Sequence, residues 1–149
     1  MSAEASSAFI VDASVAVKWV VDEQFSDAAR LLAGARLYAP DLLYIECANI
    51  LWKKAVKGDV THSQAARALK ELRTSPVTIV VSGPLLEKAL AMAGVLRHPV
   101  YDCLYLALAE EKKMPLVTAD ERLARVLAQR KLAGVEVQMV KDLRSWSHP

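Results

Sequence analysis

Short apolar segments alternate with longer amphipathic segments along this chain. Residues 8–11 are apolar and end at Asp12, and from Ser14 onward the apolar spacing becomes helical. Alternation of this kind predicts short buried strands joined by helices, which is typical of a parallel sheet covered on both faces. In such sheets, ligands bind beyond the carboxyl ends of the strands, near a switch in strand order.

Glycine, proline and capping residues mark the boundaries of the predicted elements. Gly58 ends one helical pattern, and Thr61 precedes the next as its expected N-cap. Strands are expected at 8–11, 37–39, 76–81, 116–117 and 135–140, and helices at 14–20, 26–33, 41–57, 61–74, 84–96, 100–113 and 120–132. We therefore predict an α/β fold with three α/β/α layers and a short-stranded, mainly parallel central sheet.

The composition agrees with this fold class. A chain of 149 residues, of which 54% are hydrophobic, fits one domain with a substantial core. No apolar run approaches the roughly 20 residues of a membrane span, and the N-terminus lacks the basic start of a signal peptide. We expect a cytoplasmic protein with a single domain over residues 1–143. Residues 144–149 look like a cloning junction and the start of an affinity tag, so Trp146 and His148 are assigned no function.

The cysteines and histidines indicate neither a redox site nor a zinc site. Cys47 and Cys103 lie in apolar helical patterns, which favours two buried, unpaired side chains over a disulfide or redox pair. His62 and His98 are isolated and flanked by turn residues, so zinc lacks a set of ligands.

The charge of the chain gives little information about nucleic acid. The formal net charge is only +2. Basic side chains nevertheless cluster in two segments, at Lys53, Lys54, Lys57, Arg122 and Arg125. Solvated helix faces are the ordinary interpretation of such residues, and contact with phosphate groups is the alternative.

Four carboxylates carry the candidate chemistry: Asp12, Glu46, Asp102 and Asp120. Three of them open predicted helices after predicted strands, and each of these three has an ordinary structural alternative. Asp12 suits an N-cap, and Asp102 suits the positive end of a helix dipole. Asp120 also suits the dipole, because Thr118 and Glu121 have the spacing of a capping box.

Glu46 is different, because it lies among apolar neighbours on its own helical face. Leu43, Asn49 and Ile50 are three or four positions away, and an acid in this setting is seldom buried without a partner. If the fold brings the four acids together, two carboxylates about 4 Å apart repel by roughly 4 kcal/mol. Oxygen ligands without His or Cys favour Mg²⁺ or Mn²⁺ as the cation that relieves this repulsion.

The ordered acidic motifs resemble those of the PIN domain, and most closely those of the VapC-type toxins of bacterial and archaeal toxin–antitoxin pairs. Four segments carry the resemblance: FIVDAS, IECAN, VYDCLYLALA and TADERL. Each motif is short, but their order is fairly specific, and the resemblance spans residues 8–140.

The resemblance implies a Mg²⁺- or Mn²⁺-dependent endoribonuclease that often acts on transfer RNA. By position, Asp12, Glu46 and Asp102 would be metal ligands, and Asp120 would be a ligand directly or through water. The residues that match the supporting polar positions of the family are Ser14, Asn49 and Thr118. The metal would neutralise phosphate charge and activate a water molecule for in-line attack.

The resemblance also implies two protein partners and no membrane partner. One is a small VapB-like antitoxin whose tail blocks the site, and the other is a second copy of the chain in a homodimer. Trp19 and Trp52 lie on predicted helices that flank the cleft, so they are candidates to line an apolar groove for the antitoxin. Packing of these two side chains in the core is the alternative.

Two other functions compete with a nuclease. A phosphoacceptor receiver domain needs adjacent acids after the first strand and an acceptor Asp after the third. Here Asp12 stands alone, and residues 80–83 contain no acid. The remaining alternative is a non-catalytic RNA- or protein-binding module with the PIN fold, although the intact acidic set argues against it.

Overall fold

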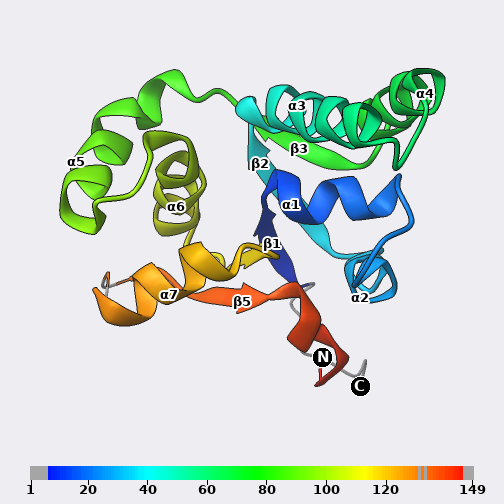
Figure 1. The fold of residues 1–149 in the computed structure, drawn as a ribbon. Coiled ribbons are helices and arrows are strands. Elements are labelled where there is room, and N and C mark those ends of the chain that lie inside the picture. Colours follow the sequence, from blue (N-terminus) through cyan, green and yellow to red (C-terminus); the bar gives the residue numbers. More distant parts are fainter. Residues whose placement is uncertain (1–6, 131, 133, 146–149) are drawn as a thin grey trace.

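The computed structural model describes residues 7–130, 132 and 134–145 (Figure 1). The residues interpreted as the start of an affinity tag, 146–149, lie outside the described residues. Within the described chain, five parallel strands form one sheet in the order β3-β2-β1-β4-β5. The strands are β1 (Ala8–Val11), β2 (Arg36–Pro40), β3 (Val77–Val80), β4 (Leu116–Thr118) and β5 (Val137–Met139).

Helices connect each strand to the next. They are α1 (Ala13–Ala16), α2 (Ser26–Arg30), α3 (Leu42–Lys57), α4 (His62–Arg73), α5 (Leu86–Leu96), α6 (Val100–Lys112) and α7 (Glu121–Gln129). Short 3₁₀ segments follow α1, precede α5 and follow β5, at η1 (Val17–Trp19), η2 (Gly83–Leu85) and η3 (Val140–Ser145).

The helices cover both faces of the sheet. The chain moves across the sheet in one direction from β1 to β3, and in the opposite direction from β3 through β4 to β5. Since crossovers between parallel strands are right-handed, this reversal puts α1–α4 on one face and α5–α7 on the other. Figure 1 shows α3 and α4 on one side of the strands and α5 and α6 on the other. The predicted three-layer α/β/α fold is confirmed, with a sheet that is parallel throughout the described residues.

Three predicted elements are longer than the observed ones. One is the helix expected at 120–132, which is observed as α7 and ends at Gln129. The helix expected at 26–33 ends at Arg30, because the following residues form tight turns that lead to Gly34 at φ +89°. The strand expected at 135–140 is confined to Val137–Met139, because β5 aligns with only three residues of β4.

The ends of the long helices follow their capping residues. α3 ends at Gly58, whose φ of +84° is a left-handed conformation that glycine adopts without strain. At the start of α4, the Thr61 hydroxyl accepts a hydrogen bond from the Gln64 N–H at 3.0 Å, and the Gln64 side-chain oxygen accepts one from the Thr61 N–H at 2.8 Å. This reciprocal capping box confirms Thr61 as the N-cap.

Helix α6 lies at the centre of the core. Its residues from Cys103 to Ala109 are all buried, and the helix packs against β1 and β2. Cys103 and Cys47 are both free and buried, as the sequence predicted. None of the helices in the described residues has the length and apolar character needed to cross a membrane.

Candidate active site

The carboxyl ends of β1 and β4 lie side by side where the strand order changes direction. β2 pairs with one edge of β1, and β4 pairs with the other edge. Val11 aligns with Val117 in this register, so the next positions, Asp12 and Thr118, are also adjacent. This is the position at which open parallel sheets bind ligands.

Both carboxylate oxygens of Asp12 accept hydrogen bonds. The Val15 N–H donates to Oδ1 at 3.2 Å, which makes Asp12 the N-cap of α1. The Ser14 hydroxyl donates to Oδ1 at 2.5 Å, and the Thr118 hydroxyl donates to Oδ2. The carboxylate is therefore fixed by donors from α1, which follows β1, and from β4. The residue is only 6% exposed.

Ser14 and Thr118 also join the loops that follow β1 and β4. The Ser14 hydroxyl accepts a hydrogen bond from the Ala119 N–H at 2.9 Å, and the Thr118 hydroxyl accepts one from the Asp120 N–H at 3.0 Å. Thr118 is fully buried. The two hydroxyls predicted to support the site thus both contact Asp12 and hold the surrounding backbone.

The environment of Asp12 disfavours its charged form. Burial raises the pKa of Asp12 from 3.8 to about 6, although the hydrogen bonds from Ser14, Thr118 and Val15 lower it. The negative charge of Asp102 raises the pKa further. Burial and a nearby like charge are the two physical causes that push protons onto a carboxylate.

Glu46 and Asp102 belong to the same electrostatic environment. Glu46 lies in α3 and Asp102 in the first turn of α6. The prediction that Asp102 opens a helix after a strand is wrong, because α6 follows α5. Burial raises the pKa of Glu46, and the charge of Asp102 raises it further. Because Asp102 acts on both Asp12 and Glu46, three acids from distant parts of the sequence face one region. Within the described chain, however, no three His, Cys, Asp or Glu side chains lie close enough to hold one ion together.

The Tyr105 hydroxyl is a further polar group at this site. The sequence pattern around Tyr105 is that of an ordinary core residue. Tyr105 is 1% exposed. Of the buried polar side-chain atoms in the described residues, the Tyr105 hydroxyl oxygen is the one without a hydrogen-bond partner. Burial and the charge of Glu46 raise the pKa of Tyr105, while the hydroxyl in turn lowers the pKa of Glu46. Buried tyrosine hydroxyls usually find a partner. This orphaned atom therefore suits a site whose hydrogen bonds are completed by a ligand.

Asp120 and Asn49 are less closely connected to the other acids. Oδ1 of Asp120 accepts hydrogen bonds from two N–H groups of the following turn, at 2.9 and 3.3 Å, so Asp120 is the N-cap of α7. The interpretation of Thr118 as that cap is wrong, because its hydroxyl donates to Asp12. Asn49 is exposed on α3, one turn from Glu46.

His98 contacts one of the predicted ligands directly. The sequence suggested an isolated histidine, which is wrong, because Nε2 of His98 lies 2.5 Å from Oδ2 of Asp102. The His98 side chain is 4% exposed and that of Asp102 is 28% exposed. The spacing of four residues is the signal that could have identified this pair, since such positions are neighbours on a helix.

The lysine cluster on α3 is only partly available to a ligand. Lys54 forms an ion pair with Glu23, which also pairs with Lys18 at 3.2 Å. Although burial opposes the effect, these lysines lower the pKa of Glu23. Lys54 therefore has a structural partner, which corrects its interpretation as part of a free basic face. The basic residues that are exposed in the two segments are Lys53, Lys57, Arg122 and Arg125.

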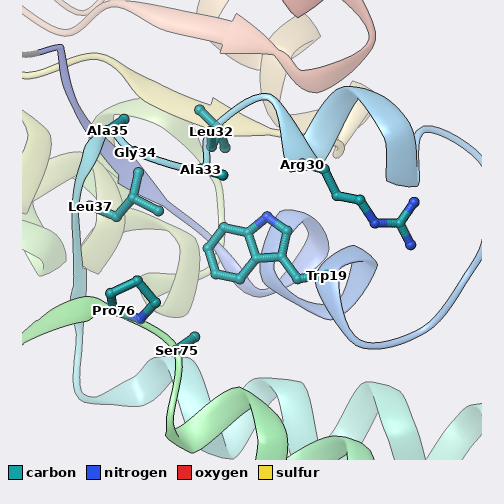
Figure 2. A pocket seen from close by; sticks show the side chains of 9 residues that line it. All are labelled: Trp19, Arg30, Leu32, Ala33, Gly34, Ala35, Leu37, Ser75 and Pro76. Atoms are coloured by element: carbon teal, nitrogen blue, oxygen red, sulfur yellow. The ribbon is translucent and has the colours of Figure 1, made fainter.

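Trp19 lines a pocket far from the acids. Its indole N–H donates to the Ala29 carbonyl at 3.0 Å, and the ring forms one wall of a largely apolar pocket of about 290 Å³ (Figure 2). Leu37 at the start of β2 and Pro76 just before β3 line the same pocket. Because these positions lead into parallel strands, the pocket lies at the opposite end of the sheet from Asp12.

Trp52 lies on the helix that carries Glu46, and it is exposed. Three apolar side chains with exposed fractions of 57% or more lie on α3, at Ile45, Trp52 and Val56. Their separations of seven and four residues put them on one face of the helix. We call these three residues the α3 stripe. Of the two tryptophans, only Trp52 therefore presents apolar surface on the helix that carries Glu46.

The donor set suits a hard divalent cation. Asp12, Glu46 and Asp102 offer only oxygen atoms, which are the preferred ligands of Mg²⁺ and also suit Mn²⁺. Burial is the main cause of the raised pKa values of Asp12 and Glu46, and the negative charge of Asp102 adds to it. Since the three carboxylates do not meet in the described structure, a shared cation would have to draw their side chains together.

The chain is similar in sequence to known proteins. The family model of the PIN domain matches residues 9–128. Ribonuclease VapC3 of Pyrobaculum aerophilum is 37% identical over 121 residues, which cover 77% of this chain and 91% of that protein.

Two solved structures have a similar fold. The crystal structure of a Pyrobaculum aerophilum protein matches with a TM-score of 0.70 and 26% identity, covering 95% of this chain and 96% of that chain. A toxin–antitoxin complex from Klebsiella pneumoniae matches with a TM-score of 0.61 and 15% identity, covering 85% and 93%. The family model and the similarity to VapC3 show that this chain belongs to the PIN domain family, among its VapC members.

Proposed function

We propose that this chain is a Mg²⁺- or Mn²⁺-dependent endoribonuclease that hydrolyses RNA phosphodiester bonds, with transfer RNA as a candidate substrate. The observation that carries the proposal is the buried Asp12 carboxylate at the carboxyl ends of β1 and β4, where Ser14 and Thr118 hold it and the charge of Asp102 acts on it. A buried carboxylate near a second acid is unfavourable unless a proton or a cation neutralises it. The similarity to Ribonuclease VapC3 of Pyrobaculum aerophilum supports the ribonuclease activity.

The residues proposed to hold the cation are Asp12, Glu46, Asp102 and Asp120, the last directly or through water. When bound there, the cation would supply neutralisation of phosphate charge and activation of a water molecule for hydrolysis. Ser14 and Thr118 keep the Asp12 carboxylate oriented through their hydrogen bonds. Asn49 is exposed one turn from Glu46, where its amide is available to hydrogen-bond the substrate.

Exposed basic side chains are proposed to position the RNA backbone. Lys53 and Lys57 follow Glu46 on α3, and Arg122 and Arg125 lie on α7 after β4. Contacts from such residues to phosphate groups fix register and orientation without reading the sequence. The choice of RNA then depends on the shape of the substrate at the cleavage position.

We further propose that the chain is the toxin of a type II toxin–antitoxin pair. Its partner would be a small VapB-like antitoxin, whose apolar segment covers the α3 stripe beside Glu46. The toxin–antitoxin complex from Klebsiella pneumoniae, which has a similar fold, supports a partner of this kind. The proposal includes a homodimer in the cytoplasm, with one nuclease domain over residues 1–143.

The test is cleavage of RNA by the purified chain, with Mn²⁺ or with a chelator. Wild type is expected to cut at a small set of positions with Mn²⁺ and at none with the chelator. Asp12→Asn and Asp102→Asn are expected to reduce cleavage by more than about a hundredfold, because each removes a charge that holds the cation. Asp27→Asn is the matched control, since this side chain is fully exposed on α2. Undiminished cleavage by Asp12→Asn would refute the proposal.

The second candidate function is a non-catalytic RNA- or protein-binding module. It is favoured by one observation, that no three potential metal ligands meet within the described residues. This alternative predicts RNA binding that is insensitive to Mn²⁺ and no cleavage by wild type. Sequencing RNA ends after brief expression of wild type and Asp102→Asn separates the two functions and identifies the substrate.

A further inference from the structure

His98 lies in the turn between α5 and α6 and is held there from several directions. Its backbone N–H donates to the Ala93 carbonyl at 3.3 Å, and its carbonyl oxygen accepts from the Cys103 thiol at 3.8 Å. Pro99 follows as the N-cap of α6. The imidazole is almost completely buried, so the backbone and the packing together determine where its ring nitrogen lies.

The contact between His98 and Asp102 has a defined direction. A charged carboxylate can only accept hydrogen bonds, so Nε2 of His98 is the donor and Oδ2 of Asp102 is the acceptor. Hydrogen bonds to a charged acceptor are stronger than those between neutral groups. The bond occupies one oxygen of Asp102 and restricts rotation of its side chain.

Of the other two predicted ligands, Asp12 has side-chain donors of its own, since it accepts hydrogen bonds from Ser14 and Thr118. The Tyr105 hydroxyl influences the pKa of Glu46 but has no hydrogen-bond partner among the described residues. In the described residues, the side chain that is hydrogen-bonded to Asp102 is the His98 imidazole. Partners that orient a metal ligand in this way typically change metal affinity 10–100-fold when they are removed.

We propose that His98 is a positioning residue that orients the Asp102 carboxylate for a divalent cation, an inference that rests on the proposed metal-dependent function. His98 does not contact the cation or the RNA in this role. It acts by donating one hydrogen bond, so a neutral donor at the same place is sufficient.

The test compares His98→Gln with His98→Met in the full chain. Gln and Met have similar length and flexibility, but only Gln retains a side-chain N–H donor. Isothermal titration calorimetry with Mn²⁺ measures the affinity of each variant, and thermal melting without cation verifies that each is folded. We expect His98→Met to weaken Mn²⁺ binding about tenfold or more and His98→Gln to stay within about threefold of wild type.

Two controls sharpen the comparison. His62→Met changes an exposed histidine at the start of α4 and is expected to leave Mn²⁺ affinity unchanged. In an Asp102→Asn background, His98→Met is expected to have no further effect, because the group that it orients is no longer a charged ligand.

The outcomes separate this inference from the proposed function. If wild type and His98→Met bind Mn²⁺ equally well, or if His98→Gln loses as much affinity as His98→Met, the positioning role is wrong while the metal site stands. The same holds if His98→Met still weakens binding in the Asp102→Asn background. If wild type itself binds no Mn²⁺, the proposed metal-dependent function fails and this inference fails with it.

Discussion

The Thr118 hydroxyl donates a hydrogen bond to Oδ2 of Asp12, although 106 positions separate the two residues in the sequence. The parallel pairing of β1 with β4 explains the contact, because it aligns Val11 with Val117 immediately before them. Thr118 is thus the donor from β4, while Ser14 and the N–H of Val15 are donors from the segment after β1. The charged form of Asp12 depends on all three.

Replacing Thr118 with Val removes one of these donors at nearly constant shape. We expect Thr118→Val to lower the free energy of unfolding by about 1–3 kcal/mol at pH 7, because a buried carboxylate loses a partner. Urea unfolding measures the change. Thr78→Val, at an exposed position of β3, is the matched control and is expected to stay within about 0.5 kcal/mol of wild type. Equal stability of the two variants would show that the contact contributes nothing.

The raised pKa of Asp12 predicts that the metal-free protein loses stability as the pH rises. The stabilising effect of a protonated Asp12 is complete below 3.8, its pKa in the unfolded chain, and is lost as the pH passes through about 6. The loss amounts to roughly 3 kcal/mol. Urea unfolding from pH 4 to pH 7 in the presence of a chelator measures it.

Asp12→Asn is the control for this pH dependence, because an amide does not titrate in this range. We expect the variant to lack most of the decline between pH 4 and pH 7 and to be at least as stable as wild type at pH 7 without cation. A decline of the same size in the variant would assign the effect to other groups, of which Glu46 is the first, since its pKa is also raised.

Binding of Mg²⁺ or Mn²⁺ is expected to stabilise wild type more than Glu46→Gln. A ligand that binds only the folded state raises the melting temperature, and the neutral amide is a weaker ligand than the carboxylate. The increase should also be larger at pH 7 than at pH 5, because the cation competes with protons for the carboxylates. Differential scanning calorimetry measures both effects, and equal increases in wild type and Glu46→Gln would remove Glu46 from the site.

The unpartnered hydroxyl of Tyr105 predicts an unusual effect of its removal. Tyr105→Phe is expected to leave the stability of the metal-free protein unchanged or to raise it by about 1 kcal/mol, because a buried polar atom without a partner is removed. Tyr101→Phe, at a position 63% exposed on the same helix, is the matched control. A loss of more than 1–2 kcal/mol specific to Tyr105→Phe would indicate a hydrogen bond to a polar group in the metal-free protein.

The fold was predictable because each element has a local signal. The apolar run before Asp12, the glycine at 58 and the N-cap residue Thr61 each predicted a boundary that the structure has. The alternation of strands and helices then left a parallel sheet as the simplest arrangement. Two of the elements predicted too long, at 26–33 and 135–140, end where tight turns or a short partner strand intervene. These limits depend on tertiary pairing, which local patterns do not contain.

The candidate site was predictable only in its acidic positions. The sequence indicates which acids follow strands, but it does not show which donors hold them. His98 looked isolated because its partner is a side chain on the following helix, and Tyr105 looked like an ordinary core residue of α6. Asp120 is the N-cap that Thr118 was expected to be, because the Thr118 side chain is directed from β4 toward Asp12 at the end of the neighbouring strand.

The separation of Asp12 from Thr118 along the chain also sets the order in which the centre matures during translation. The amino-terminal acid emerges from the ribosome early, whereas its partner strand emerges after most of the polypeptide has been made. Nascent chains that stop before β4 therefore lack the pairing that anchors this acid. The complete centre can therefore form only when the polypeptide is nearly finished.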